Sequence, residues 1–246
     1  MLSNLVLHMV LLYHPCETRC ADILNYMNTI PYRRFITGAM FLSLLGLLLF
    51  IIGAITNQQL THAYLFWNLF LAWIPFGLSL IIYISAAKQW SILVSILLAI
   101  WLLFLPNTFY MLTGYIHVTE VARVDPVFDS VMFGVIIPIG FALGIASLLL
   151  VHTTLLRFVS VVKSHVMIGI IIAASSFAIY LGRVLRFNSW DIIANPIGLL
   201  SDIINIVFQP YQNGMAYSTT FTFFIVITAI YMAAWYMMNE PRMKKD

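Results

Sequence analysis

Charged residues are scarce in this 246-residue chain, and their scarcity excludes an ordinary soluble fold. Only 9% of the residues are charged, 62% are hydrophobic, and the mean hydropathy is +0.98. A soluble domain carries about 25% charged residues to cover its surface. The basic patch in a folded polar module that nucleic-acid binding requires is also missing. The composition therefore predicts a multi-pass membrane protein that binds no nucleic acid.

Cysteine is nearly absent, and several catalytic motifs are missing. The two cysteines, Cys16 and Cys20, lie in the first twenty residues, so neither a disulfide framework nor a cysteine metal site supports the main body. We find no strict metal motif such as His-Glu-x-x-His, no glycine-rich phosphate loop and no nucleophile elbow. We expect no cofactor, and the sequence leaves open whether the protein is an enzyme.

Six apolar segments are present, and they predict an all-α bundle of six transmembrane helices. The segments are residues 35–55, 64–86, 90–105, 128–151, 166–181 and 217–238. A spanning helix needs about 20 residues. The third segment is short, so either its helix continues past a kink at Pro106 or its tilted ends reach the interface by snorkelling. Between Trp190 and Gln209 the chain stays apolar but is broken at Asn195-Pro196, which predicts a pair of short interfacial or re-entrant helices.

The rest of the chain is short and flanks this single membrane domain. We assign residues 1–34 to an amino-terminal extension, 35–239 to the membrane domain and 240–246 to a basic tail. Residues 1–26 precede Met27 and are interpreted as an upstream extension of the reading frame or a weakly ordered appendage. The alternative is an interfacial helix over residues 2–13, which is too short to span a bilayer.

Lysines and arginines are distributed unevenly between alternate connections. With the amino terminus in the cytoplasm, nine of the twelve lie on the cytoplasmic side and only Arg123, Arg183 and Arg186 lie outside. The nine are Arg19, Arg33, Arg34, Lys88, Arg157, Lys163, Arg242, Lys244 and Lys245. The positive-inside rule therefore predicts that both termini are cytoplasmic. The cytoplasmic (plasma) membrane is the expected location.

This orientation brings polar groups from separate parts of the chain to one depth on the outer face. Asn68 lies near the outer end of the second span, Asn107 closes the third, and Asp129 opens the fourth. Arg183 and Arg186 follow the fifth. The cytoplasmic connections hold little beyond anchoring charges. We therefore predict one shared polar site on the extracytoplasmic face.

Three segments resemble a known membrane family. They are residues 67–75 (WNLFLAWIP), 104–117 (FLPNTFYMLTGYIH) and 180–191 (YLGRVLRFNSWD). Together they resemble the signature segments of the bacterial membrane family called domain of unknown function 1361, over roughly residues 35–237. The resemblance implies no established activity. It marks Asn68, Pro106, Asn107, Tyr110, His117, Asp129, Arg183, Arg186, Asn188, Trp190 and Asp191. Family members usually carry an aspartate where this chain has Gly114, which argues against a carboxylate-plus-histidine mechanism at that segment.

Arg183 and Arg186 are three residues apart and so share a helix face. Two guanidinium groups on one face can clamp a phosphate through paired hydrogen bonds. The alternatives are that they snorkel to lipid headgroups at a helix end, or that they pair with Asp129 and Asp191 to lock the bundle.

The remaining motifs have plainer interpretations. Asn188 with Asp191 three residues later resembles the start of a helix, so capping is favoured for Asn188. His117 and Glu120 have the spacing of two metal ligands, with Asp125 or Asp129 as a third, but without a strict motif we predict no metal. Gly140-x-x-x-Gly144 is typical of a close helix contact, and Pro138 of a kink.

Three classes of function remain open at this level. The first is handling of a lipid or polyprenyl phosphate in the outer leaflet. The second is a transporter or channel subunit, for which breaks at Pro106 and Asn195-Pro196 are the usual indication. The third is a non-catalytic assembly or accessory protein. For the first class, the ligand candidates are Arg183, Arg186, Asn107, Tyr110, Asn68 and Trp190, and the structural or acid-base candidates are His117, Asp129, Asp191 and Asn188. The expected partner is membrane lipid, specifically an anionic lipid or polyprenyl phosphate.

Overall fold

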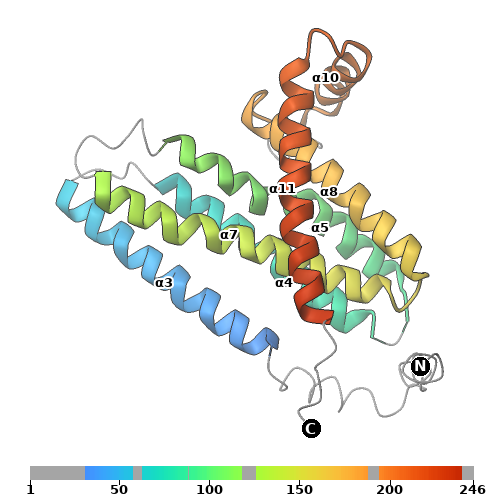
Figure 1. Cartoon of the computed structure of the whole chain (residues 1–246), viewed down its shortest axis with the longest axis horizontal. Coiled ribbons are helices and arrows are strands. Elements are labelled where there is room, and N and C mark those ends of the chain that lie inside the picture. The colour runs from blue at the N-terminus through green and yellow to red at the C-terminus, as the bar shows by residue number, and fades with distance from the viewer. Residues whose placement is uncertain (1–30, 58–62, 88, 118–125, 188–193, 240–246) are drawn as a thin grey trace.

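The chain forms a bundle of long helices (Figure 1). The computed structural model of the protein describes residues 31–57, 63–87, 89–117, 126–187 and 194–239. The elements are α3 (Pro31–Asn57), α4 (Ala63–Ser85), α5 (Ile92–Tyr110), the 3-10 helix η1 (Met111–His117), α7 (Pro126–Leu155), α8 (Val161–Arg183), α10 (Pro196–Phe208) and α11 (Gly214–Asn239). The predicted amino-terminal segment 1–26 and basic tail 240–246 lie outside the described residues.

Six of these helices are long and apolar enough to cross a membrane, as predicted. They run over Arg33–Ile55, Ala63–Ser85, Ile92–Tyr115, Val127–Leu155, Val161–Arg183 and Gly214–Met238. Large apolar side chains point outward along them, such as Phe41, Leu44 and Ile55 of α3, which are 66%, 63% and 72% exposed. Such a surface is stable in lipid and not in water. The protein is therefore a multi-pass membrane protein.

Helix α7 lies at the centre of the bundle. About 78% of its most apolar window is buried, against 11% for the corresponding windows of α3 and α11. It packs against α3, α4, α5, α8, α11 and η1. One apolar core, including Trp101 and Phe109, lies between α7 and the helices α5, α8 and α11. A second, including Phe76 and Phe133, lies between α7, α3 and α4.

Two glycines of α7 allow its close approach to the outer part of α5. A Cβ atom at Gly140 would overlap the sulfur of Met111, and one at Gly144 would overlap Thr108 and the ring of Phe109. Small residues spaced four apart allow two helix backbones to approach closely. The close helix contact predicted for the Gly140-x-x-x-Gly144 motif is confirmed.

The third span does not end at Pro106. Helix α5 continues through Pro106 to Tyr110, and η1 extends the apolar segment further. Proline removes one backbone donor and disturbs the preceding turn. Here the side-chain carboxamide of Asn107 donates to Phe104 O at 3.2 Å, and the side-chain hydroxyl of Thr108 donates to Leu105 O at 2.8 Å. These two hydrogen bonds lie in the turn where α5 continues past Pro106. Of the two alternatives for the short third span, continuation of the helix past Pro106 is therefore correct.

The region around Asn195-Pro196 agrees with the prediction as far as it is described. The short helix α10 begins at Pro196, and the non-helical Asn195 separates it from Ala194, which is itself helical. The carboxamide oxygen of Asn195 accepts a hydrogen bond from Gly198 N at 3.2 Å, and Pro196 occupies the first turn, where its missing N–H is harmless. A preceding helix would involve residues 188–193, which lie outside the described residues.

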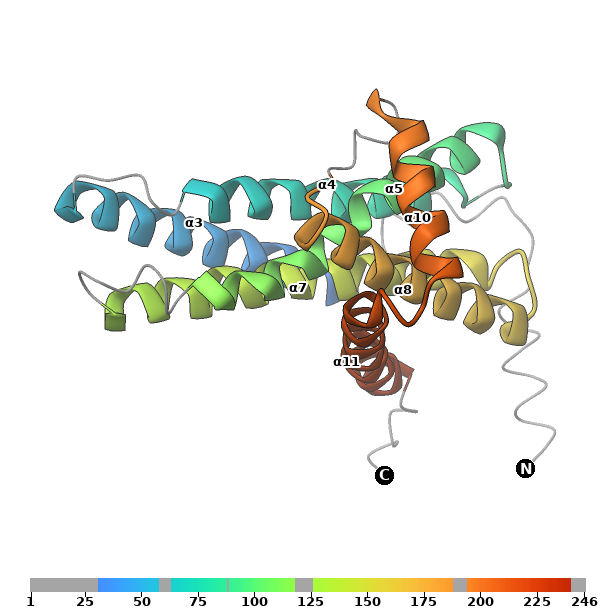
Figure 2. The ribbon, with the colours of Figure 1, turned by 90° about the horizontal axis from the view of Figure 1, so that it is seen from above.

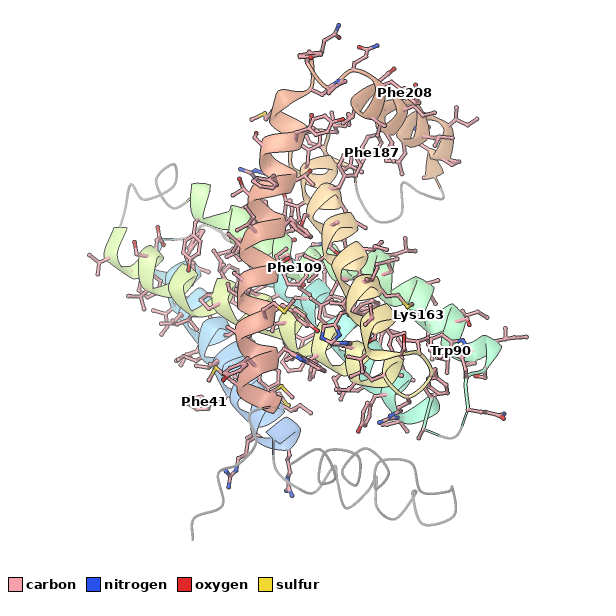
Figure 3. The ribbon with its side chains drawn as sticks, turned by 45° about the vertical axis from the view of Figure 1, so that its right-hand side comes forward. Phe41, Trp90, Phe109, Lys163, Phe187 and Phe208 are labelled. Atoms are coloured by element: carbon pink, nitrogen blue, oxygen red, sulfur yellow. The ribbon has the colours of Figure 1, made fainter. Side chains whose placement is uncertain are left out.

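Basic residues lie at both ends of the bundle, and we use them to name the ends. The end with Arg33, Arg157 and Lys163 is called the inner end, and the end with Arg183 is called the outer end. At the inner end the rings of Trp90 and Phe158 are 5.3 Å apart, which joins the α4–α5 and α7–α8 connections. Figure 3 shows Trp90 and Lys163 near this end of α8 and Phe187 at the opposite end.

Helix α11 crosses the bundle at a steep angle. It runs across α7 and α8 in Figure 1 and is seen nearly along its axis in Figure 2. It packs mainly on α8, with a smaller contact to α7. Six crossings return the chain to the side from which it started, so α3 begins and α11 ends on the same side of the membrane.

Candidate functional site

A cavity of about 480 Å³ lies at the outer end, between α4, α5 and α8. Its lining comes from the outer half of each helix, together with Phe187 and Leu199 of the segment that follows α8. The lining residues are Tyr64, Trp67, Asn68, Leu71, Leu102, Leu103, Phe104, Pro106, Asn107, Tyr110, Ala174, Ser175, Ala178, Ile179, Leu181, Gly182, Phe187 and Leu199. Among the described residues that line it, none is charged. The cavity is an apolar space with a few neutral polar groups.

Small side chains on one face of α8 leave room for the cavity. Ser175, Ala178 and Gly182 recur at helical spacing and all line it. A Cβ atom at Gly182 would make ordinary contact with the ring of Tyr110, at 3.8 Å. Opposite them, α4 and α5 present longer side chains. The space therefore follows from small residues on one helix facing large residues on two others.

Three predicted site residues meet in this cavity. Asn68 comes from α4, and Asn107 and Tyr110 come from α5. Within the described part of the chain, the carboxamide of Asn68 and the phenol hydroxyl of Tyr110 have no hydrogen-bond partner in the protein, whereas Asn107 donates to Phe104 O. In lipid, polar groups need a partner. Asn68 and Tyr110 are therefore available to a molecule in the cavity.

Ser175 also lines the cavity and was missed by the sequence reasoning. Its hydroxyl is buried and has no partner among the described residues, while the neighbouring Ser176 hydroxyl donates to Ile172 O at 2.8 Å. A serine in an apolar helix gives no signal of its own, because its hydroxyl normally returns to its own backbone. Only the three-dimensional arrangement distinguishes Ser175 from Ser176.

The arginine pair lies beside the cavity and not in its lining. Arg183 is the last residue of α8 and is half-buried, and Arg186 is exposed. The prediction that the two arginines share a helix face is wrong, because α8 ends at Arg183 and Arg186 has a φ of 60°, a left-handed conformation that is unfavourable for a residue with a side chain. The turn that it makes lets Phe187 N donate to Leu181 O at 3.1 Å. Phe187 thereby lines the cavity, and the two arginines lie next to its outer limit.

The remaining predicted residues are not part of this cavity. Asp129 is buried in the first turn of α7, where a carboxylate is stabilised by the positive end of the helix dipole. His117 ends η1, and nothing further is described of its side chain. Asn188, Trp190 and Asp191 lie outside the described residues, as do Glu120 and Asp125. Within the described ranges no three histidine, cysteine, aspartate or glutamate side chains form a group that could hold a metal ion.

Gly114 lies in an apolar contact between η1, α4 and α7. A Cβ atom there would lie 3.2 Å from Ile137 Cδ1 and 3.6 Å from Leu65 Cδ2. A carboxylate at this position would face aliphatic side chains. The surroundings of Gly114 are thus those of a packing position.

A buried polar network at the inner end was also missed. His152 of α7 is fully buried, its Nε2 lies 3.1 Å from Ser164 Oγ of α8, and its Nδ1 is hydrogen-bonded by the Tyr231 hydroxyl of α11. The Ser164 hydroxyl donates to Val161 O at 2.8 Å, so it accepts from His152. The imidazole is therefore protonated on Nε2 and accepts on Nδ1. A histidine inside the run Leu148-Leu-Leu-Val-His152 was the available sequence signal.

Over the described residues, the fold and the cavity define an all-helical integral membrane protein with six spans and a neutral cavity at one end of the bundle. The chain belongs to the family described as "Protein of unknown function (DUF1361)", whose model matches residues 67–233, more than half of the 246 residues. The match runs from within α4 to within α11 and includes nearly all of the cavity lining. No curated protein and no solved structure matches the chain.

Proposed function

We propose that the protein binds an anionic membrane lipid at the outer end, with a hydrocarbon chain in the cavity and the charged headgroup beside Arg183 and Arg186. The observation that carries this proposal is the cavity itself. Its walls are mostly aliphatic and aromatic, and its few polar groups are uncharged. An anion placed inside would lose its hydration without gaining a cation, which is strongly unfavourable. A hydrocarbon chain has no such penalty.

The side of the bundle gives a route for entry from lipid. Trp67 and Leu102 line the cavity, and they are 54% and 38% exposed. Exposed apolar side chains of a spanning helix face the acyl chains of the bilayer. The exposure of two large apolar side chains in the cavity wall supports an opening of the cavity toward the membrane.

The arginines supply the charge that the cavity lacks. Arg183 and Gly182 are consecutive, and Arg186 precedes Phe187, so each arginine is the sequence neighbour of a lining residue. A guanidinium presents a planar fork of donors that matches phosphate oxygens, and it is the most common partner for a phosphate that must be held in one orientation. The headgroup proposed here is accordingly a phosphate, carried by a phospholipid or by a polyprenyl chain.

The features that favoured a transporter are weaker in the folded chain. Pro106 lies within a continuous α5, and Asn195-Pro196 begins α10 outside the spans. Neither is a break in a crossing helix, which is the usual indication of a transport site. A lipid chain would occupy the observed cavity, so we prefer lipid binding to transport as the proposed function.

Native mass spectrometry of the purified protein in a neutral detergent tests the proposal. The wild-type protein should retain an anionic lipid from the membrane. Ala178→Phe places a ring in the cavity and should remove that lipid. Ala173→Phe is the matched control, because Ala173 is exposed on the same helix and does not line the cavity. A wild-type protein without lipid, or equal lipid content in both variants, would contradict the proposal.

A further inference from the structure

The polar groups at the outer end lie at different depths along α8, and their depths indicate which class of lipid fits the cavity. The charged Arg183 and Arg186 lie outside the cavity, Tyr110 lies beside Gly182 at the outer end of its wall, and Ser175 lies deeper. From Gly182 to Ser175 the distance along α8 is about 10 Å, at a rise of about 1.5 Å per residue. From outside to inside, the charged arginines are followed by neutral polar groups that lie among aliphatic and aromatic side chains.

The neutral polar layer has groups that are not satisfied by the protein. Asn68 offers two donors and an acceptor, and Tyr110 offers a hydroxyl, and neither has a protein partner within the described residues. Ser175 is 1% exposed, and its buried hydroxyl also has no partner among the described residues. These groups come from three different helices and lie around one cavity. An oxygen-bearing ligand would satisfy them, and a pure hydrocarbon would not.

We infer that the ligand is an acyl-ester phospholipid, whose phosphate lies beside the arginines and whose uncharged ester linkage is hydrogen-bonded by Asn68 and Tyr110. This inference rests on the proposed function and selects between its two candidate ligands. A glycerophospholipid carries ester oxygens directly below its phosphate, with hydrocarbon beyond them. A polyprenyl phosphate is hydrocarbon from the first carbon after the phosphate, so it would leave the amide and the hydroxyl without partners.

The experiment compares three probes on one protein. Lipid-stripped protein in a neutral detergent is titrated with a diacyl phosphatidylglycerol, with its dialkyl-ether analogue, which lacks the carbonyl acceptors, and with a polyprenyl monophosphate. Binding is measured by native mass spectrometry. For the wild-type protein we expect the diacyl lipid to bind about five- to tenfold more tightly than the ether lipid, the effect of losing one or two neutral hydrogen bonds. The polyprenyl phosphate should bind more weakly than the diacyl lipid.

Tyr110→Phe and Asn68→Leu should each reduce the preference for the ester over the ether lipid. Ser176→Ala is the matched control, because the Ser176 hydroxyl is bonded to its own helix, and it should keep the full preference. Equal affinity of the wild-type protein for ester and ether lipids, or tighter binding of the polyprenyl phosphate, would overturn the inference while leaving lipid binding intact. Failure to bind any of the three probes would overturn the proposed function itself.

Discussion

The hydroxyl of Tyr231 donates a hydrogen bond to Nδ1 of His152, and this bond joins α11 to α7 at the inner end of the bundle. The ring of Trp235 lies against the same imidazole at an interplanar angle of 33°, with ring centroids 4.1 Å apart. On the other side, His152 reaches Ser164 of α8. Helix α11 is otherwise largely exposed. The network is therefore a main specific attachment of the last helix to the bundle.

Tyr231→Phe should destabilise the protein by about 1 kcal/mol. The change leaves the ring in place and removes only the hydroxyl, so that Nδ1 of a buried imidazole loses its donor; hydrogen bonds of this kind within membranes are worth about 0.6–2 kcal/mol. Unfolding in a mixed detergent series measures the effect. Tyr236→Phe is the control, because Tyr236 lies on the same helix and is 68% exposed. Equal stability of the two variants would show that the bond contributes nothing.

The six spans were predictable because their cause is local. A long apolar run followed or preceded by arginine or lysine is sufficient to place a helix such as α3 or α8, to within about a turn and a half at each end. The continuation of α5 past Pro106 was not decided by sequence, because it depends on whether neighbouring side chains satisfy the disturbed turn. The break at Asn195-Pro196 was predictable, because asparagine before proline favours a helix start and disfavours a continuous helix across it.

The cavity was predictable only in part. Asn68, Asn107 and Tyr110 carry polar groups in apolar segments, and that contrast is visible in the sequence. Ala178 and Gly182 contribute by being small, and small residues in a spanning helix are equally typical of close packing. Gly140 illustrates this, because its lack of a side chain serves packing against Met111 and leaves no space. Which small residues face a neighbour and which face a cavity depends on the rotation of each helix.

Gly140→Ala and Gly144→Ala should each destabilise the protein by about 1–3 kcal/mol. An added methyl group at Gly144 would overlap Thr108 and the ring of Phe109, and one at Gly140 would overlap the side chain of Met111 and force it to move. Gly134→Ala is the matched control on the same helix, because no atom lies within 4 Å of the added Cβ there. Alanine at residue 134 should be neutral or slightly stabilising, since it favours the helix. Thermal unfolding in detergent measures all three, and a stable Gly144→Ala would show that the contact is loose.

The orientation of the bundle is tested by the reaction of single cysteines with an impermeant maleimide in intact cells. In a background where Cys16 and Cys20 are replaced by serine, Tyr211→Cys at the outer end should react, because Tyr211 is fully exposed. Gln89→Cys and Ser160→Cys are exposed at the inner end and should react only after the membrane is permeabilised. The reverse pattern would place the cavity on the cytoplasmic side.

The two roles proposed for Arg186 predict opposite results for Arg186→Gly. The residue holds a left-handed conformation, with a φ of 60°, which costs about 1–2 kcal/mol for a residue with a side chain and little for glycine. Glycine therefore keeps the turn that directs Phe187 to the cavity, while it removes the guanidinium. If Arg186 binds a phosphate headgroup, Arg186→Gly should be as stable as the wild-type protein or slightly more stable, and it should retain less anionic lipid in native mass spectra.

Arg186→Lys separates charge from geometry in the same measurement. Lysine keeps the positive charge but loses the planar fork of donors, so its lipid content should fall between those of the wild-type protein and Arg186→Gly. Lys163→Gln is the control, because it removes one exposed charge at the inner end, and it should leave the lipid content unchanged.

If Arg186 instead neutralises a carboxylate in a partly buried network, its removal leaves that carboxylate unpaired at a cost of about 3–5 kcal/mol. Arg186→Gly would then unfold readily, with the lipid content per folded molecule unaltered, and the phosphate role of the arginine would be excluded.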